Sequence, residues 1–275
     1  MFKDQKFSSV DKLIEFLNDR EFSSKYIYRG QYNISWELKS SLERILKGKY
    51  ESLSDYYENY LINSFQSRYS LYGKSNVSPK FKLEWLSMMQ HYGVPTRMLD
   101  FTKSPYVALY FILEDIIKSP GDEMEFVIYA INHDEIGGKS LEYLKNQCAS
   151  NTIQEIINQT KSPSELLFMR NELFDAFAQQ SLDILWITDP GTFNSRIERQ
   201  AGCFLYSANI KKTIKHLLES ELYYDIKNYR IIIQHSCWKE IYDLLGKMNI
   251  NSRTIYGDLE GLSKSLTLSI MHRER

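Results

Sequence analysis

The sequence has few of the residues that interrupt or cross-link a chain. Among its 275 residues are 12 glycines, 6 prolines and 3 cysteines. Such low glycine and proline contents argue against a low-complexity or loop-dominated chain. The cysteines, Cys148, Cys203 and Cys237, are far apart and odd in number, so no pair has the spacing of a metal or redox motif. We therefore expect reduced thiols and a cytoplasmic protein.

Net charge and long apolar runs are lacking as well. The formal net charge is −1, with acidic and basic residues spread along the chain. Non-specific nucleic-acid binding requires a surplus of Lys and Arg, so only a local basic patch stays open. No apolar run is long enough to span a bilayer, and residues 1–6 lack the apolar core of a signal peptide. A membrane partner is not expected.

The composition that is present favours a large core. Hydrophobic residues make up 43% of the chain and aromatic residues 14%. Strand-like segments alternate with helical ones without a regular βαβ rhythm, which favours an α+β fold over a doubly wound sheet. We predict a single domain over residues 1–275 with a mixed or antiparallel sheet surrounded by helices. Residues 1–24 are expected to hold an N-terminal helix, and the polar residues 139–182 a helical insertion.

Local patterns place the individual elements. Period-two alternation predicts strands at residues 25–29, 125–131, 202–206 and 229–233, and residues 181–188 fit a strand or a loop. Helices are predicted at residues 9–17, 53–72, 81–92, 105–115, 211–218, 237–246 and 254–268. Gly93 suits a left-handed helix C-cap, and Ser104 followed by Pro105 suits a helix start. Residues 95–102 cannot form a regular helix, and a proline-constrained loop is expected there.

The common chemical signatures are absent from the sequence. It contains no Walker loop, no dinucleotide glycine motif and no zinc-protease or nucleophile-elbow motif. The five histidines form no i, i+4 pair, so a helical metal site is not expected. Any chemistry must therefore come from residues scattered along the chain.

Residues 90–104 hold the densest group of candidate side chains. A helix end, a proline-containing loop and a helix start follow one another there, which is a suitable cradle for a phosphate or pyrophosphate. The alternative is that Asp100, Thr102 and Ser104 only cap the helix and brace the loop. The candidates in this segment are His91, Thr96, Arg97, Asp100, Thr102 and Ser104.

Two further segments carry candidates. Arg29 ends a predicted strand, and its planar fork suits a phosphate or carboxylate, with Gly30 allowing close approach and Gln31 beside it. The alternative for Arg29 is an ordinary surface ion pair. Glu198 and Gln200 precede another strand, where an acid or amide can orient a ribose hydroxyl or simply belong to a turn. His91 is either an acid–base group or a packed, hydrogen-bonded histidine.

Several of these segments resemble the FRG domain, a family named for a Phe-Arg-Gly signature. The resembling blocks read YRGQ at residues 28–31, QHYGVPTRMLDFT at residues 90–102 and SPYVALYF at residues 104–111, followed by RQAGCF at residues 199–204 and IYGDLEGL at residues 255–262. Members of the family are bacterial and viral proteins. The resemblance implies a role in phage conflict.

A second resemblance is to the Arg-Ser-Glu class of ADP-ribosyltransferases, and it implies an ADP-ribosyltransferase-like fold. By this resemblance Arg29 holds the pyrophosphate of NAD, and Thr102 and Ser104 brace the nicotinamide ribose. Gln200 or Glu198 takes the catalytic-acid position, where the transferases have a carboxylate. Glu198 is expected on the same side of an extended strand as Gln200, since side chains two apart on a strand share a face. NAD is then the co-substrate, and no metal is implied.

Two functions follow from these observations. One is an NAD-dependent ADP-ribosyltransferase or NAD glycohydrolase of a toxin or phage-defence system, acting on a protein or nucleic-acid target. The other is a non-catalytic module that senses a nucleotide or a phage component and signals through a partner protein; the amide of Gln200 favours it. A Mg²⁺-dependent nuclease using Asp100 and His91 is disfavoured, because no carboxylate cluster is visible.

Overall fold

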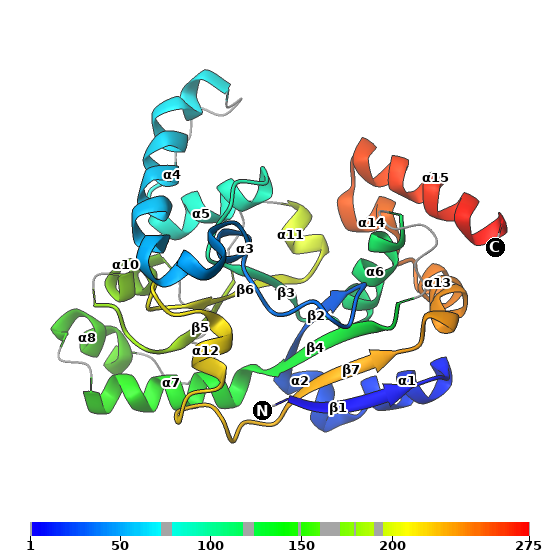
Figure 1. Ribbon diagram of the computed structural model, residues 1–275, viewed down its shortest axis with the longest axis horizontal. Helices are drawn as coiled ribbons and strands as arrows, with labels where there is room; N and C mark the ends of the chain where they lie inside the picture. Colours follow the sequence, from blue (N-terminus) through cyan, green and yellow to red (C-terminus); the bar gives the residue numbers. More distant parts are fainter. Residues whose placement is uncertain are drawn as a thin grey trace.

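A seven-stranded sheet forms the centre of the part of the chain that the structure describes (Figure 1). The structure is a computed structural model that describes residues 2–72, 79–117, 124–147, 150–159, 171–178, 180–189 and 195–274. The strand order is β1-β7-β4-β2-β3-β6-β5. The strands are β1 (Phe2–Phe7), β2 (Tyr26–Gln31), β3 (Leu99–Thr102), β4 (Phe126–Asn132), β5 (Leu185–Thr188), β6 (Gly202–Ser207) and β7 (Asn228–Ile233).

The sheet is mixed, as the sequence predicts. Edge strand β1 pairs with β7 in parallel, while the other neighbours in the sheet pair antiparallel. The predicted strands at 25–29, 125–131, 202–206 and 229–233 coincide with β2, β4, β6 and β7, and residues 181–188 end in strand β5. The α+β class is therefore confirmed.

Two strands differ from the prediction. Residues 2–7, within the segment expected to hold an N-terminal helix, form β1, although the predicted helix itself is present as α1 (Val10–Leu17). Residues 99–102 form β3 instead of an irregular loop. Both strands are short or half exposed, so their patterns carry little alternation; pairing with β7 and with β6 decides their conformation.

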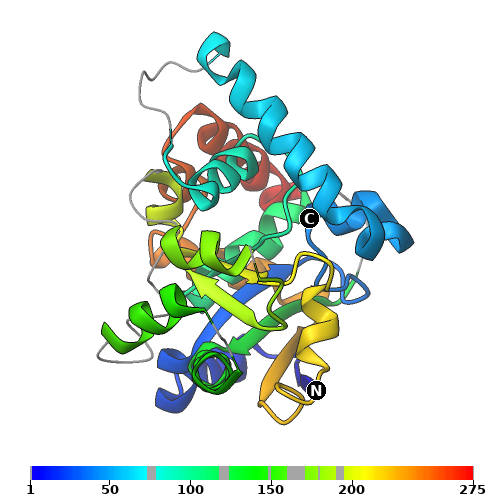
Figure 2. The same cartoon turned by 90° about the vertical axis from the view of Figure 1, so that its left-hand side faces the viewer.

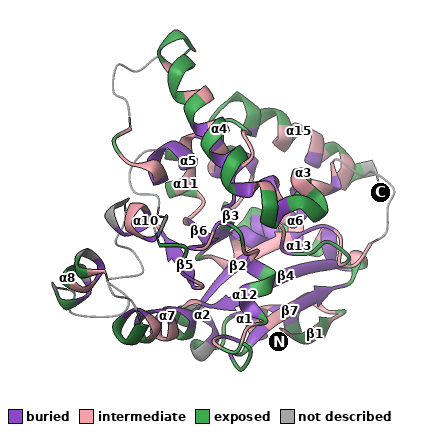
Figure 3. Ribbon diagram, turned by 60° about the vertical axis from the view of Figure 1, so that its left-hand side comes forward, coloured by how far each residue is buried: buried purple, intermediate pink, exposed green. Residues whose placement is uncertain are grey.

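Helices cover both faces of the sheet. Along β4, successive side chains point to opposite faces, so Phe126 and Ile128 join one core cluster while Val127 and Tyr129 join another. The first cluster contains α1, α6 (Pro105–Ile116), α13 (Trp238–Lys247) and the C-terminal helices; the second contains α12 (Ile214–Leu218). A third cluster lies under α4 (Tyr50–Tyr72) and α5 (Lys82–His91). Figure 3 shows the strands largely buried between these layers.

The helices that the sequence predicts are present with small shifts. Ser104 caps α6 by accepting a hydrogen bond from the backbone N–H of Val107 (3.3 Å), and Pro105 occupies its first turn. Gly93 follows α5 in the left-handed region, with φ of 79°. Helix α4 stands out from the body of the molecule (Figures 1 and 2). The remaining short helices are α2 (Arg20–Lys25), α3 (Ser41–Leu46), a 3-10 turn at Lys47–Lys49 and another at His235–Cys237.

The predicted C-terminal helix at 254–268 is in fact two helices. Helix α14 (Ser252–Tyr256) ends at Gly257, whose φ of 74° only glycine adopts without strain, and α15 (Leu259–Glu274) follows. Most of the described residues within 139–182 lie in helices, namely α7 (His133–Gln147), α8 (Asn151–Gln159) and α10 (Asn171–Ala178). Residues 148–149, 160–170 and 179 lie outside the described residues, and Cys148 with them. Whether the segment is an insertion stays a prediction.

None of the helices in the described ranges combines the length and the apolar character that a membrane span requires.

Candidate functional site

A pocket of about 280 Å³ opens where β2 and β3 part. These two strands share only the pair Tyr28–Thr102, and the residues next to that pair, Arg29 on β2 and Phe101 on β3, line the pocket. Its volume lies at the lower end of the range of ligand pockets. Strand β6 and helices α5, α6 and α11 (Ser195–Arg199) complete the wall.

Three of the predicted site residues meet in this pocket. Arg29, Thr102 and Gln200 are far apart in the sequence, yet all three line it. They are joined there by Gly30, His91 and Asp100, which the sequence also singled out. The adjacency of β2, β3 and β6 in the sheet produces this convergence, because Arg29 lies on β2, Thr102 on β3 and Gln200 in the turn that leads into β6.

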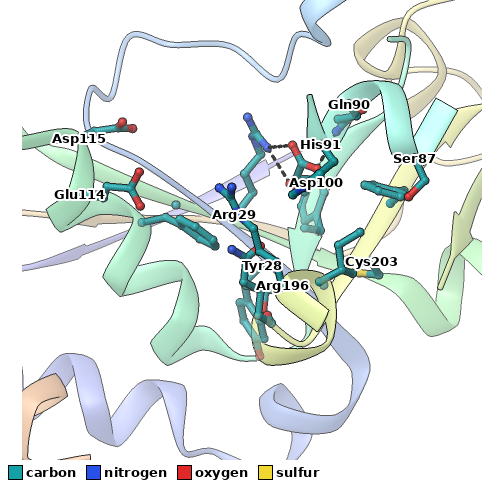
Figure 4. Close-up of a pocket in the computed structure, with 18 residues that line it drawn as sticks. Tyr28, Arg29, Ser87, Gln90, His91, Asp100, Glu114, Asp115, Arg196 and Cys203 are labelled. Carbon is teal, nitrogen blue, oxygen red and sulfur yellow. Dashed lines mark hydrogen bonds and ion pairs between the residues drawn. The ribbon is translucent and has the colours of Figure 1, made fainter. Parts of the chain in front are cut away.

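Arg29 lies at the centre of the pocket (Figure 4). Its Nη1 donates a hydrogen bond to the backbone carbonyl of Asp100 (2.7 Å), and Nη1 lies 3.9 Å from the Asp100 carboxylate. Burial lowers the pKa of Arg29 from its ordinary value, and the Asp100 carboxylate partly opposes that shift. Its Nε is buried without a hydrogen-bond partner among the described residues. The guanidinium therefore retains donor capacity toward a ligand.

Gly30 serves the packing of the sheet. A Cβ at this position would lie 2.1 Å from the carbonyl oxygen of Ala108, so helix α6 crosses β2 at a distance that only glycine permits. The sequence suggested that Gly30 lets a backbone or a ligand approach closely, and in the structure the backbone of α6 does so. As a result α6 brings Glu114 and Asp115 to the side of the pocket opposite Asp100 (Figure 4).

Asp100 is held by α5. Gln90 Nε2 donates to the carboxylate of Asp100 (2.6 Å), and Thr96 Oγ1 donates to Gln90 Oε1. The chain Thr96–Gln90–Asp100–Arg29 fixes the orientation of the guanidinium. Asp100 does not cap α6, contrary to the alternative weighed from the sequence; only Ser104 has that role.

Thr102 and Gln200 are tied to each other directly. Thr102 Oγ1 donates to the backbone carbonyl of Gln200 (2.7 Å) and accepts from the N–H of Ser104 (3.0 Å). The next residue, Ala201, has a φ of 46°, and its carbonyl accepts from the N–H of Lys103 (2.9 Å). These hydrogen bonds hold the turn at residues 200–201 against the end of β3. The side-chain Nε2 of Gln200 is buried without a hydrogen-bond partner among the described residues, and so is a donor available to a ligand.

The expected geometry of Glu198 is wrong. Residues 195–199 form helix α11 and Gln200 lies in a turn, so Glu198 and Gln200 do not share the face of an extended strand. Glu198 is exposed and does not line the pocket, whereas Arg196 and Ile197 of the same helix do. The backbone N–H of Ala201 bonds the Glu198 carbonyl (3.0 Å), which ends the helix before a strand can begin.

Glu114 and Asp115 make the pocket a site of mixed charge. Glu114 accepts hydrogen bonds from the Tyr256 hydroxyl and from Lys264 Nζ (2.7 Å), so its carboxylate is anchored from the C-terminal helices. With Asp100, three carboxylates and two guanidiniums, those of Arg29 and Arg196, line one cavity. Such a lining suits a ligand that carries both an anionic group and hydroxyl donors.

His91 lies at the end of α5 on the pocket wall. Partial burial lowers its pKa from the ordinary value, and the positive charge of Arg196 lowers it further. At neutral pH the imidazole is therefore neutral and able to accept a proton. Among the described residues, no group of three or more His, Cys, Asp or Glu side chains is arranged to hold a metal ion.

Four predicted ligand-binding residues lie outside the pocket lining. Ser104 caps α6, and Thr96 exchanges hydrogen bonds with Ser41 and Gln90. Gln31 is buried at the end of β2. Arg97 is 2% exposed and forms an ion pair with Glu58 of α4, Nε to Oε2 3.1 Å. The loop position of Arg97 suggested exposure, but the packing of α4 and α10 covers it.

The α11 wall is held by the C-terminal helices. Arg199 Nη1 donates to the Tyr256 carbonyl (3.0 Å), and a Cβ on Gly257 would lie 1.3 Å from that same Nη1. Arg196 stacks its guanidinium 4.0 Å from the centre of the Tyr256 ring and lies 3.5 Å from Glu260. Helices α14 and α15 thereby set the position of the turn that carries Gln200.

Sequence reasoning missed part of the lining. Phe111, Glu114 and Asp115 share one face of α6 at i, i+3 and i+4 spacing, and this helical period was the available signal. Gln90 stands in the block of residues 90–97 but was not named as a site residue. For Arg196 the sequence carries no comparable signal.

Comparison with known proteins adds a family match. Residues 24–120 match the model of the FRG domain. The matched segment contains β2, α5, β3 and α6, and so includes Arg29, His91, Asp100 and Thr102, while Gln200 and its α11 wall lie beyond it. No curated protein and no solved structure matches the chain.

Proposed function

We propose, from the match of residues 24–120 to the FRG domain and from the geometry of the pocket, that the pocket binds NAD and that the protein is an ADP-ribosyltransferase-like enzyme. The observation that carries the proposal is the meeting of Arg29, Thr102 and Gln200 in one cavity. These three positions are the ones that the resemblance to the Arg-Ser-Glu transferases assigns to the pyrophosphate, the nicotinamide ribose and the catalytic acid.

The roles of these residues follow from their bonding. Arg29 keeps a buried Nε that can donate to a pyrophosphate oxygen, and charge-assisted bonds of this kind are the strong ones. Gln200 keeps a buried Nε2 that can donate to a ribose hydroxyl oxygen. Thr102 acts indirectly, since its hydroxyl is already engaged with the Gln200 carbonyl and the Ser104 N–H.

The chemistry of such an enzyme is cleavage of one bond. The bond between ribose C1′ and the nicotinamide nitrogen breaks, nicotinamide leaves with the electron pair, and a nucleophile of a protein or nucleic-acid target, or water, attacks C1′. The proton of that nucleophile goes to a base, and neutral His91 on the pocket wall can take it. The carboxylates of Glu114, Asp115 and Asp100 supply negative charge in the pocket where Gln200 has none.

The test is incubation of the purified protein with NAD labelled in the adenosine, in the presence of bacterial lysate. We expect nicotinamide release and label transfer to a macromolecule, and we expect Arg29→Ala to lose both activities. Arg68→Ala on α4, an exposed arginine far from the pocket, is the matched control and should behave as wild type. Turnover that survives Arg29→Ala unchanged would show that the pocket is not the site.

The toxin or phage-defence setting belongs to the same proposal. Induced expression in bacteria should lower cellular NAD and arrest growth, and Arg29→Ala should relieve both effects. Growth arrest that persists with Arg29→Ala at equal protein level counts against a toxin acting through this pocket.

The second candidate is a nucleotide-sensing module that acts through a partner protein. It is favoured by the amide of Gln200, which cannot give the full negative charge that an oxocarbenium-like transition state requires, and by the exposed position of Glu198 outside the pocket. Calorimetry with NAD and ADP-ribose separates the two candidates. Saturable binding that depends on Arg29, with no nicotinamide release, identifies the sensor.

A further inference from the structure

Helix α15 carries a continuous apolar stripe on its outer face. Leu259, Leu262, Leu266 and Ile270 are 82%, 42%, 58% and 62% exposed. Their spacing of three, four and four residues places them on one side of the helix over its whole length. Leu268, on the opposite side, is 2% exposed and belongs to the core. The core therefore uses one face of α15 and leaves the other, equally apolar, face in solvent.

Contiguous apolar surface of this kind marks an interaction site. Figure 1 shows α15 at the edge of the molecule, with its outer side facing away from the sheet, and Figure 3 shows the helix largely exposed. Tyr256 and Lys264 bond Glu114 of α6, Arg196 of α11 stacks on Tyr256, and Gly261 lets α15 pack closely on α14. The stripe is therefore presented on a firmly held helix.

We propose that this stripe is the contact surface for a second copy of the chain, with the two α15 helices packed antiparallel about a twofold axis. The spacing is nearly symmetric about the centre of the stripe: in the antiparallel arrangement Leu262 of one copy meets Leu266 of the other, and Leu259 meets Ile270. An isologous contact requires this self-complementarity.

The charges of α15 favour the same orientation. Asp258 lies just before the helix and Arg273 near its end, whereas Glu260 is already paired with Lys264 and Arg196, and His272 with Asp243. Antiparallel packing places the acidic end of each helix near the basic end of its partner, and opposes the two helix dipoles. Parallel packing would place Asp258 beside Asp258 and Arg273 beside Arg273, which costs free energy.

The size of the stripe limits its strength. A stable standard-size interface covers about 800 Å² on each partner, more than four side chains of one helix face provide. The dimer is therefore expected to be in rapid, concentration-dependent exchange with the monomer.

Sedimentation of the full chain over a wide concentration range tests the proposal. The apparent mass should rise from 32.5 kDa toward twice that value. Leu262→Glu/Leu266→Glu, both at exposed positions, should keep the wild-type unfolding temperature and remain at the monomer mass. Leu71→Glu on α4, at a 76% exposed leucine, is the matched control and should associate as wild type.

Cross-linking tests the orientation. A mixture of Leu259→Cys and Ile270→Cys chains should form more disulfide-linked dimer than either variant alone, because two copies of residue 259 would be separated by roughly 16 Å along the axis at 1.5 Å per residue. A wild-type chain that stays monomeric at every concentration overturns the proposal. So does association that survives the double glutamate variant or is lost in Leu71→Glu. Equal cross-linking of each variant alone overturns the antiparallel arrangement. None of these measurements involves NAD, so their outcome is independent of the proposed function.

Discussion

Arg29 and Arg97 are both predicted from the sequence to bind a ligand, but their surroundings in the structure differ. Arg29 lies in the pocket with a fifth of its side chain exposed, one hydrogen bond to a backbone carbonyl and a distant, mostly exposed carboxylate. Arg97 is 2% exposed, paired with the equally buried Glu58, and stacked 4.8 Å from the centre of the Phe174 ring. The pocket arginine faces a cavity, while the buried one is committed to an ion pair inside the protein.

The difference shows how burial decides the role of a charge. A buried guanidinium must have its charge compensated, so the fold supplies Glu58, and Glu58 in turn is approached by Lys82 (2.9 Å). Arg29 faces a cavity, and its charge can be compensated by a ligand. We expect the first arginine to govern stability and the second to govern binding.

The largest effect is expected from Arg97→Met. The change removes one of the two cationic partners of a carboxylate that is 1% exposed and leaves it with Lys82. Breaking a buried pair typically costs about 3–5 kcal/mol, so we expect a loss at the low end, about 3 kcal/mol, in the free energy of unfolding. Urea denaturation measures it. Adding Glu58→Leu should recover part of the loss, because the buried carboxylate, which Lys82 alone would compensate, is then gone. An Arg97→Met protein as stable as wild type would contradict the buried pair.

Gly257→Ala should rank second. The new Cβ would overlap Arg199 Nη1 at 1.3 Å, and the residue has a left-handed φ, so we expect about 1–3 kcal/mol of destabilisation. Because Arg199 belongs to α11, ligand affinity in the pocket should fall as well. Gly246→Ala in α13, where a Cβ meets open space, is the control and should leave both quantities near wild type. Arg199→Ala combined with Gly257→Ala should relieve the overlap and leave the backbone strain together with the loss of the Arg199–Tyr256 hydrogen bond.

Arg29→Met, unlike Arg97→Met, should change stability little and weaken ligand binding strongly. Loss of one hydrogen bond at a partly exposed site costs about 1 kcal/mol of stability or less. NAD binding measured by calorimetry should weaken at least tenfold, which corresponds to about 1.4 kcal/mol. Comparable loss of stability in the two methionine variants would abolish the distinction between the two arginines.

The smallest effect concerns His91. Its pKa is lowered in the folded protein from the ordinary value of 6.5, so the unfolded chain binds a proton more readily. Stability therefore rises with pH through that region and falls as the pH drops below about 6.5. His91→Gln should remove this slope while changing stability at neutral pH by less than about 0.5 kcal/mol. Denaturation curves across this pH range provide the comparison, and an unchanged slope in the variant would assign it to other groups.

Local sequence signals predicted much of this molecule. The start of α6 at Ser104 and Pro105, the end of α5 at Gly93 and the alternation of β4 depend on side chains within a few positions, so a single sequence contains the physical cause. Strand β3 depends on pairing with β6, about a hundred residues later, and no local pattern records that pairing.

The same limit applies to the site. Arg29, His91, Asp100, Thr102 and Gln200 were identified as residues of suitable chemistry, and all of them line the pocket. The helical state of residues 195–199, which removes Glu198 from the pocket, follows from contacts with α14 that lie some 60 positions along the chain. The prediction that Glu198 and Gln200 share a face held only if residues 198–200 formed a strand, where side chains two positions apart point the same way.

By itself, the sequence determined the α+β class, most helix boundaries and several of the residues that line the pocket, because propensity, capping and the chemistry of a side chain are local properties of the chain. Tertiary structure alone decided that Arg29 faces a cavity while Arg97 is covered, and that one face of α15 joins the core while an equally apolar face does not. Exposure depends on which distant segments pack over a residue, and that is a property of the whole fold.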